Sequence, residues 1–156
     1  MWRLETEPFV NLFLLEGRRM RYVESIAGKE MLMNFDLKKR YCYYFNEISK
    51  IPHGSRNEKS LSNYICQFAK DHHLSYKQDH VYNVLIDKPA SAGYENSEPV
   101  ILQAHIDMVC EKNDDSDHDF EKAPLDLYVE DGWLTARGTT LGADDGSGAA
   151  YMLAIL

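Results

Sequence analysis

The strongest constraint on the fold is a short apolar run at residues 100–102 that leads directly into the sequence Gln-Ala-His-Ile-Asp. A continuous apolar run is typical of a strand buried on both faces of a sheet. Residues two apart in a strand point to the same face. His105 and Asp107 are therefore predicted to emerge side by side at the carboxyl end of a buried strand.

The elements predicted around this strand favour an α/β fold. Apolar residues at helical spacing predict one helix over 37–48. A capping box formed by Ser55 and Glu58 predicts the start of a second helix, which ends near residue 72. The other predicted elements are strands at 74–77 and 83–87, a surface loop at 88–99, a hairpin with strands at 125–130 and 133–136, a glycine-rich loop at 138–148 and a helix at 149–156.

Residues 1–35 are predicted to be an extension to the domain at 36–156. The extension has no clear capping signals, so it favours at most one weak helix. Its apolar stretch at 9–15 has neither a basic segment before it nor a small-residue cleavage site after it, which argues against a signal peptide. Nothing in the chain approaches the roughly 20 apolar residues of a membrane span.

Charge and cysteine content narrow the classes of function. The net charge of -8 argues against nucleic acid and anionic membranes as partners, because both select basic surfaces. The three cysteines are widely separated and form no C-x-x-C motif, so they indicate neither a disulfide framework nor a zinc-thiolate site. A reducing cytoplasm is the simplest compartment for such a chain.

The His105-x-Asp107 pattern has two interpretations. The imidazole could bind a metal while the carboxylate holds its other nitrogen and fixes the tautomer. Alternatively, His105 is a structural histidine and Asp107 a solvated aspartate, because three-residue patterns recur often by chance.

A second pattern, Asp144-Asp145, lies between Gly142 and Gly146, where the backbone can approach other groups closely. An aspartate at this position could instead cap the helix that follows. Taken together with His105, a carboxylate here could bridge two divalent ions, and this donor set suits zinc, manganese or cobalt.

The acidic loop at 111–122, together with Asp126, resembles a calcium-binding loop in part. Asp115, Asp117 and Asp119 occupy positions 1, 3 and 5 of such a loop, with Asp126 at position 12. Position 6, which needs glycine for its sharp turn, is Phe120. The pattern therefore favours a solvated acidic loop.

Two further residues near these motifs are expected to have structural roles. His53, between a proline and a glycine, is predicted to be a turn residue. Cys110 is predicted to be a small buried residue.

Four separated segments carry a resemblance to a known family, and they cover about residues 36–156. They are SKIPHGSRNEKSL, NVLIDKPASAGYEN, VILQAHIDMVCEKND and ARGTTLGADDGSGAA, in that order. The chain resembles the M20 metallopeptidases, most closely the Xaa-His (aminoacyl-histidine) dipeptidases.

The resemblance implies roles for three residues. His105 would bind one zinc, Asp107 would orient His105 as part of the catalytic group, and Asp144 would bridge two zinc ions, with Co²⁺ or Mn²⁺ as alternatives. The implied fold is an α/β catalytic domain with a mixed sheet, joined to a second domain that serves as a lid or as the dimerisation surface of a homodimer. The implied substrate is a dipeptide with a C-terminal histidine.

The chain departs from the family pattern after Asp144. The resemblance implies a later Glu-Glu pair, another aspartate ligand, a late histidine and the second domain, and the sequence contains none of these. We therefore expect an N-terminal part that binds metal weakly and hydrolyses nothing alone. Two alternatives stay open: another M20 amidohydrolase, such as a tripeptidase or an N-acyl-amino-acid deacylase, and a catalytically silent domain that binds a metal or a partner.

Overall fold

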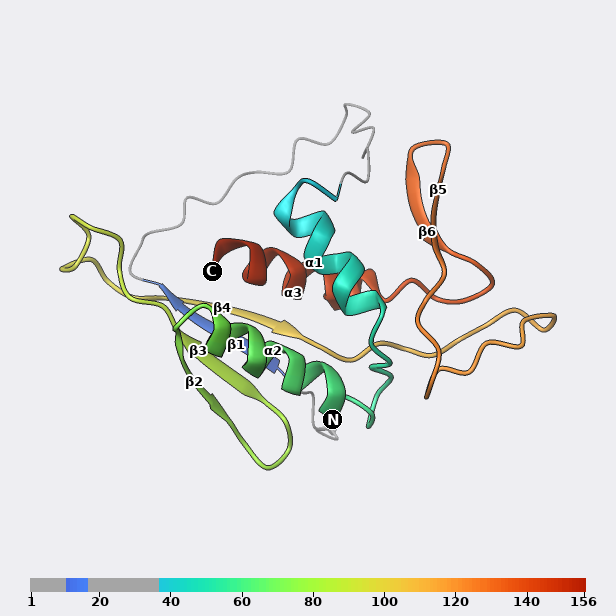
Figure 1. The fold of residues 1–156 in the computed structure, drawn as a ribbon, viewed down its shortest axis with the longest axis horizontal. Helices are drawn as coiled ribbons and strands as arrows, with labels where there is room; N and C mark the ends of the chain where they lie inside the picture. Colours follow the sequence, from blue (N-terminus) through green and yellow to red (C-terminus); the bar gives the residue numbers. More distant parts are fainter. Residues whose placement is uncertain (1–10, 17–36) are drawn as a thin grey trace, which may run out of the picture.

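The structure, a computed structural model, describes residues 11–16 and 37–156 (Figure 1). Helices and strands alternate along much of the chain, which confirms the predicted α/β class. The elements are β1 (Asn11–Glu16), α1 (Arg40–Ser49), α2 (Lys59–Asp71), β2 (Ser75–Gln78), β3 (Val84–Asp87), β4 (Val100–His105), β5 (Leu127–Glu130), β6 (Trp133–Ala136) and α3 (Ala143–Ile155).

The main sheet has the strand order β2-β3-β1-β4 and is mixed. β1 runs parallel to β3 and antiparallel to β4, and β2 runs antiparallel to β3. His105, the last residue of β4, lies opposite Asn11 in this register. The end of β4 that carries His105 is therefore paired with the first residue of β1.

β1 differs from the expectation for the first 35 residues. The sequence favoured at most one weak helix there, whereas Asn11–Glu16 forms a strand between β3 and β4. Its four consecutive apolar residues suit this place, because a strand between two neighbours pairs its backbone on both sides. The remaining residues of the predicted extension lie outside the described part of the chain.

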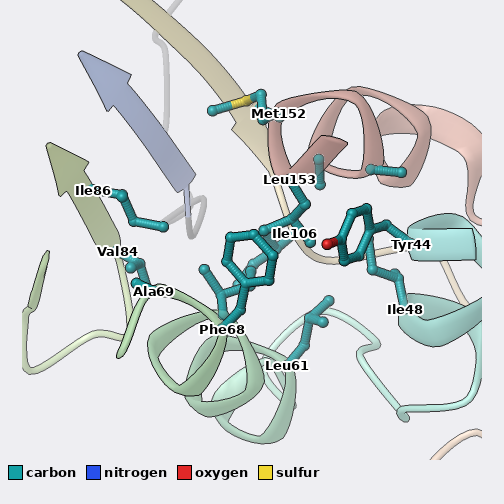
Figure 2. Close-up of a cluster of buried hydrophobic side chains, with 14 of the residues drawn as sticks. Tyr44, Ile48, Leu61, Phe68, Ala69, Val84, Ile86, Ile106, Met152 and Leu153 are labelled. Atoms are coloured by element: carbon teal, nitrogen blue, oxygen red, sulfur yellow. The ribbon is translucent and has the colours of Figure 1, made fainter. Parts of the chain in front are cut away.

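The hydrophobic core lies between the sheet and the three helices (Figure 2). Val84 and Ile86 of β3 contribute from the sheet, and both are fully buried. α2 packs on β2 and β3, while α3 packs on β4 and on α1. The helix residues that complete this core include Tyr44, Ile48, Leu61, Phe68, Ala69, Met152 and Leu153.

The prediction that β4 is buried on both faces is wrong. Leu102 and Ala104 point to the helices and are half-buried and buried, whereas the side chain of Ile101 is 64% exposed. Burial alternates along the strand because, in the described part of the chain, the helices pack against one face of it.

The predicted helices are present with shifted ends. α2 begins at Lys59, and no side chain caps it, so the predicted capping box at Ser55 is wrong. α3 begins at Ala143, earlier than expected, although Asp144 and Asp145 have non-helical backbone angles. None of the described helices has the length and apolar character needed to cross a membrane.

The predicted hairpin is confirmed. β5 and β6 pair around Asp131 and Gly132, which both have positive φ, at 49° and 81°. Positive φ at both central residues defines the type I′ turn that Asp-Gly favours. The predicted loop at 88–99 is also confirmed as an exposed irregular segment.

Two isoleucines in strands test which sheet face holds the core. We expect Ile86→Ala to lower the free energy of unfolding by about 2–5 kcal/mol, because it leaves a cavity in a fully buried site. The matched change Ile101→Ala, on the exposed face, should cost less than about 1 kcal/mol. Urea denaturation measures both values, and equal losses would contradict a one-sided core.

Candidate functional site

The carboxyl end of β4 is held by a second segment of the chain. The backbone N–H of Met108 donates to the carbonyl of His53 at 3.0 Å, and the N–H of Ser55 donates to the carbonyl of Met108 at 3.2 Å. Gly54 and Met108 form an isolated parallel bridge between these bonds. The loop before α2 therefore lies directly beside the residues that follow β4.

His105 and Asp107 contact each other as the strand period predicts. Nδ1 of His105 lies 3.0 Å from Oδ1 of Asp107 and 3.2 Å from the backbone oxygen of the same residue. Both partners accept hydrogen bonds, so Nδ1 carries the proton. The second oxygen of Asp107 accepts a 2.6 Å hydrogen bond from the hydroxyl of Ser55.

Asp144 approaches the opposite nitrogen of the same imidazole. Its Oδ1 lies 3.3 Å from Nε2 of His105, across 39 residues of sequence. Gly142 makes this approach possible, because its φ is 68° and an added Cβ would meet the sulfur of Met108 at 3.0 Å. The two patterns singled out in the sequence thus meet at one imidazole.

The two neighbouring aspartates point in different directions. The carboxylate of Asp145 lies against Gly148, where an added Cβ would collide with it. The carboxylate of Asp144 is fully exposed. The peptide bond between the two residues is cis. The N-cap of α3 is Gly142, with no side-chain cap, so neither aspartate takes the capping role considered from the sequence.

The electrostatic environment favours a charged His105. Burial alone would lower its pKa, but hydrogen bonds to Asp144 and Asp107 and the charge of Asp107 outweigh burial, and the pKa is raised. The neighbouring His53 behaves in the opposite way, because burial lowers its pKa despite a hydrogen bond to the carbonyl of Ile51.

The residues present match the chemistry of a zinc site in part. One imidazole nitrogen and one carboxylate converge, and a second carboxylate holds the other imidazole nitrogen, which is how proteins orient histidine ligands of zinc. Within residues 11–16 and 37–156, however, no group of three or more His, Cys, Asp or Glu could hold a metal ion. Catalytic zinc usually has three protein ligands, so further donors are required.

The acidic loop does not form the calcium site weighed above. Asp119 accepts a hydrogen bond from the N–H of Glu121 and pairs with Lys122 at 3.2 Å. Asp126 pairs with Arg137 at 2.9 Å. These carboxylates are bound to neighbouring protein groups, as in a solvated loop.

The loop before α2 contributes to the site, which the sequence patterns did not predict. Ser55 contacts Asp107 instead of capping the helix, and His53 is 3% exposed, so its prediction as a simple turn residue was incomplete. Cys110, predicted to be buried, is exposed. The signal that could have identified Ser55 is its place in the first family-like segment, which the capping-box pattern obscured.

Comparisons with known proteins agree on one kind of enzyme. The chain is 52% identical over 112 residues to the cytosol non-specific dipeptidase of Escherichia coli (strain K12), and the matched segment is 72% of this chain. It is also similar to the crystal structure of aminoacylhistidine dipeptidase from Vibrio alginolyticus, with a TM-score of 0.68 and 41% identity over 74% of this chain. No family model matches the chain.

Both matches cover only part of the length of the related proteins. The chain spans 23% of the length of the Escherichia coli relative and 24% of the Vibrio alginolyticus protein. Both matches support the predicted α/β fold, which the chain shares with part of each of these dipeptidases.

Replacing Asp144 tests the electrostatics of the site. We expect Asp144→Asn to lower the pKa of His105, because the bond to Asp144 is the largest of the effects that raise it. Imidazole NMR titration of the metal-free protein measures this pKa. Asp126→Asn, which removes a carboxylate paired with Arg137, is the control and should leave the pKa of His105 unchanged.

The same pair predicts the direction of a pH effect on stability. The pKa of His105 is raised in the folded state, so the interaction of protonated His105 with Asp144 stabilises the fold fully only below the unfolded-state pKa of about 6.5. This contribution is lost as the pH rises through the folded-state pKa. The difference in unfolding free energy between the wild type and Asp144→Asn should therefore shrink as the pH rises, and a growing difference would contradict the assignment.

Proposed function

We propose that this chain contributes His105 and Asp144 to the metal centre of a two-metal dipeptidase. The reason is that the chain belongs to the M20 dipeptidases over the segment that it shares with them. The observation that carries the proposal is the placement of one imidazole between two carboxylates. This arrangement leaves Nε2 facing Asp144 while Asp107 holds Nδ1.

Each residue has a distinct task in this proposal. His105 would hold one zinc ion through Nε2 and Asp144 would be the ligand shared by two, with Co²⁺ or Mn²⁺ as alternatives. Asp107 is a positioning residue, because it holds the proton on Nδ1. The lone pair of Nε2 is then available to bind a metal ion. Bound metal ions of this kind lower the pKa of a water molecule and polarise the scissile carbonyl.

The proposed substrate is a dipeptide with a C-terminal histidine. The Vibrio alginolyticus structure is an aminoacylhistidine dipeptidase, while the Escherichia coli relative is a non-specific dipeptidase, so the preference for histidine is the finer part of the proposal. The Escherichia coli relative is a cytosol enzyme, and we propose the cytoplasm for this chain as well. A tripeptidase or N-acyl-amino-acid deacylase is the competing assignment.

Zinc titration tests the proposed metal ligands. We expect weak zinc binding by the 156-residue chain, and His105→Ala should weaken it at least about tenfold, since it removes one of the two donors that converge among the described residues. Asp119→Asn is the matched control, because it removes a carboxylate from the acidic loop and leaves the site intact. Equal loss in both variants, measured by isothermal titration calorimetry, would indicate adventitious binding to acidic groups.

Hydrolysis assays test the reaction. We expect no measurable cleavage of a Xaa-His dipeptide by the 156-residue chain with added zinc, because the described residues supply too few donors for a catalytic zinc. Cleavage that is abolished by His105→Ala would overturn this expectation. In a longer protein that contains this segment, a panel of Xaa-His dipeptides, other dipeptides, tripeptides and N-acyl-amino acids should show the highest kcat/KM for Xaa-His.

A further inference from the structure

We propose that Ser55 is a positioning residue that fixes the proton of His105 on Nδ1 by holding the carboxylate of Asp107 in place. This inference rests on the proposed function, since it concerns the same site. It adds a residue from the loop before α2 to a group that otherwise comes from the end of β4, the residues just after it and the start of α3.

The geometry divides the two oxygens of Asp107 between two partners. Oδ2 accepts the hydroxyl of Ser55 at 2.6 Å, and Oδ1 lies 3.0 Å from Nδ1 of His105. A carboxylate held at both oxygens has a fixed plane, and a hydrogen bond to a charged acceptor is stronger than one between neutral groups. The bond from Ser55 therefore determines where Oδ1 points.

Ser55 is itself fixed by the backbone. Its N–H donates to the carbonyl of Met108, one residue beyond Asp107. Gly54 permits this close approach, because an added Cβ there would collide with the sulfur of Cys110. The serine hydroxyl thus reaches Asp107 from a segment that is already aligned with it.

Two carboxylates compete for the single N–H of a neutral imidazole. Asp107 faces Nδ1 at 3.0 Å and Asp144 faces Nε2 at 3.3 Å. If Asp107 can rotate, the proton shifts toward Nε2, and a protonated Nε2 cannot bind a metal. Ser55 biases this competition toward Nδ1.

The variant Ser55→Ala removes the hydroxyl, and it should still fold because Ser55 is exposed. In the metal-free protein, at a pH where the imidazole is neutral, ¹⁵N NMR should show an increased fraction of the Nε2–H form of His105. Zinc affinity should fall by up to about tenfold, because losing the direct partner of a histidine ligand costs about tenfold or more and Ser55 acts one hydrogen bond further out, through Asp107. Ser55→Thr keeps a hydroxyl and should restore both values.

Ser62→Ala is a control for the loss of a serine hydroxyl away from His105. Ser62 is buried, donates to the carbonyl of Tyr82 at 2.7 Å and accepts from the side chain of Gln78 at 2.7 Å, so its loss should lower stability but leave the tautomer of His105 unchanged. Should Ser55→Ala fail to fold, Ser55→Cys tests the same point with a weak donor of similar size.

The outcomes separate this inference from the proposed function. An unchanged tautomer in Ser55→Ala, with zinc binding intact in the wild type, overturns the role of Ser55 alone. A shifted tautomer in a protein that binds no zinc supports Ser55 and overturns the metal assignment.

Discussion

The site depends on the close approach of three backbone segments around Met108. Its N–H and carbonyl bond to residues on either side of Gly54, and its sulfur lies 3.0 Å from the place that a Cβ on Gly142 would take. Two positions without side chains therefore allow the loop before α2 and the start of α3 to meet at the end of β4. Without this packing, His105 would lack the contact with Asp144, and Asp107 would lack the hydrogen bond from Ser55.

Local patterns identified the parts of this arrangement that local chemistry decides. The two-residue period of a strand placed His105 beside Asp107, and Asp131-Gly132 defined a hairpin because few other dipeptides adopt positive φ twice. The meeting of His105 with Asp144 was expected only from the combination of two motifs. Its geometry depends on packing between segments 39 residues apart.

Features decided by distant contacts could not be read from the sequence. Ser55 also fits the capping-box pattern, but its hydroxyl donates to Asp107, which lies 52 residues away in the sequence. β1 could not be predicted for the same reason, because its short apolar segment forms a strand by pairing with β3 and β4, which are distant in the sequence. The exposure of Ile101 also follows from which sheet face the helices cover, and apolar character alone does not specify this.

In the proposed metal centre, the imidazole of His105 would bind either a proton or a metal ion. Asp107 and Asp144 favour the imidazolium in the metal-free protein, so in the proposed metal centre a proton and a metal ion would compete for Nε2 of His105. The carboxylate on Nδ1 acts in both cases, because it stabilises positive charge on the ring and makes Nε2 a stronger donor to a metal. Since a metal must displace the proton from Nε2, its binding should strengthen as the pH rises through the raised pKa of His105. Metal binding should thus strengthen as the pH rises, whereas the stabilisation by protonated His105 and Asp144 weakens. At higher pH a metal ion, in place of the proton, should connect the end of β4 to the start of α3.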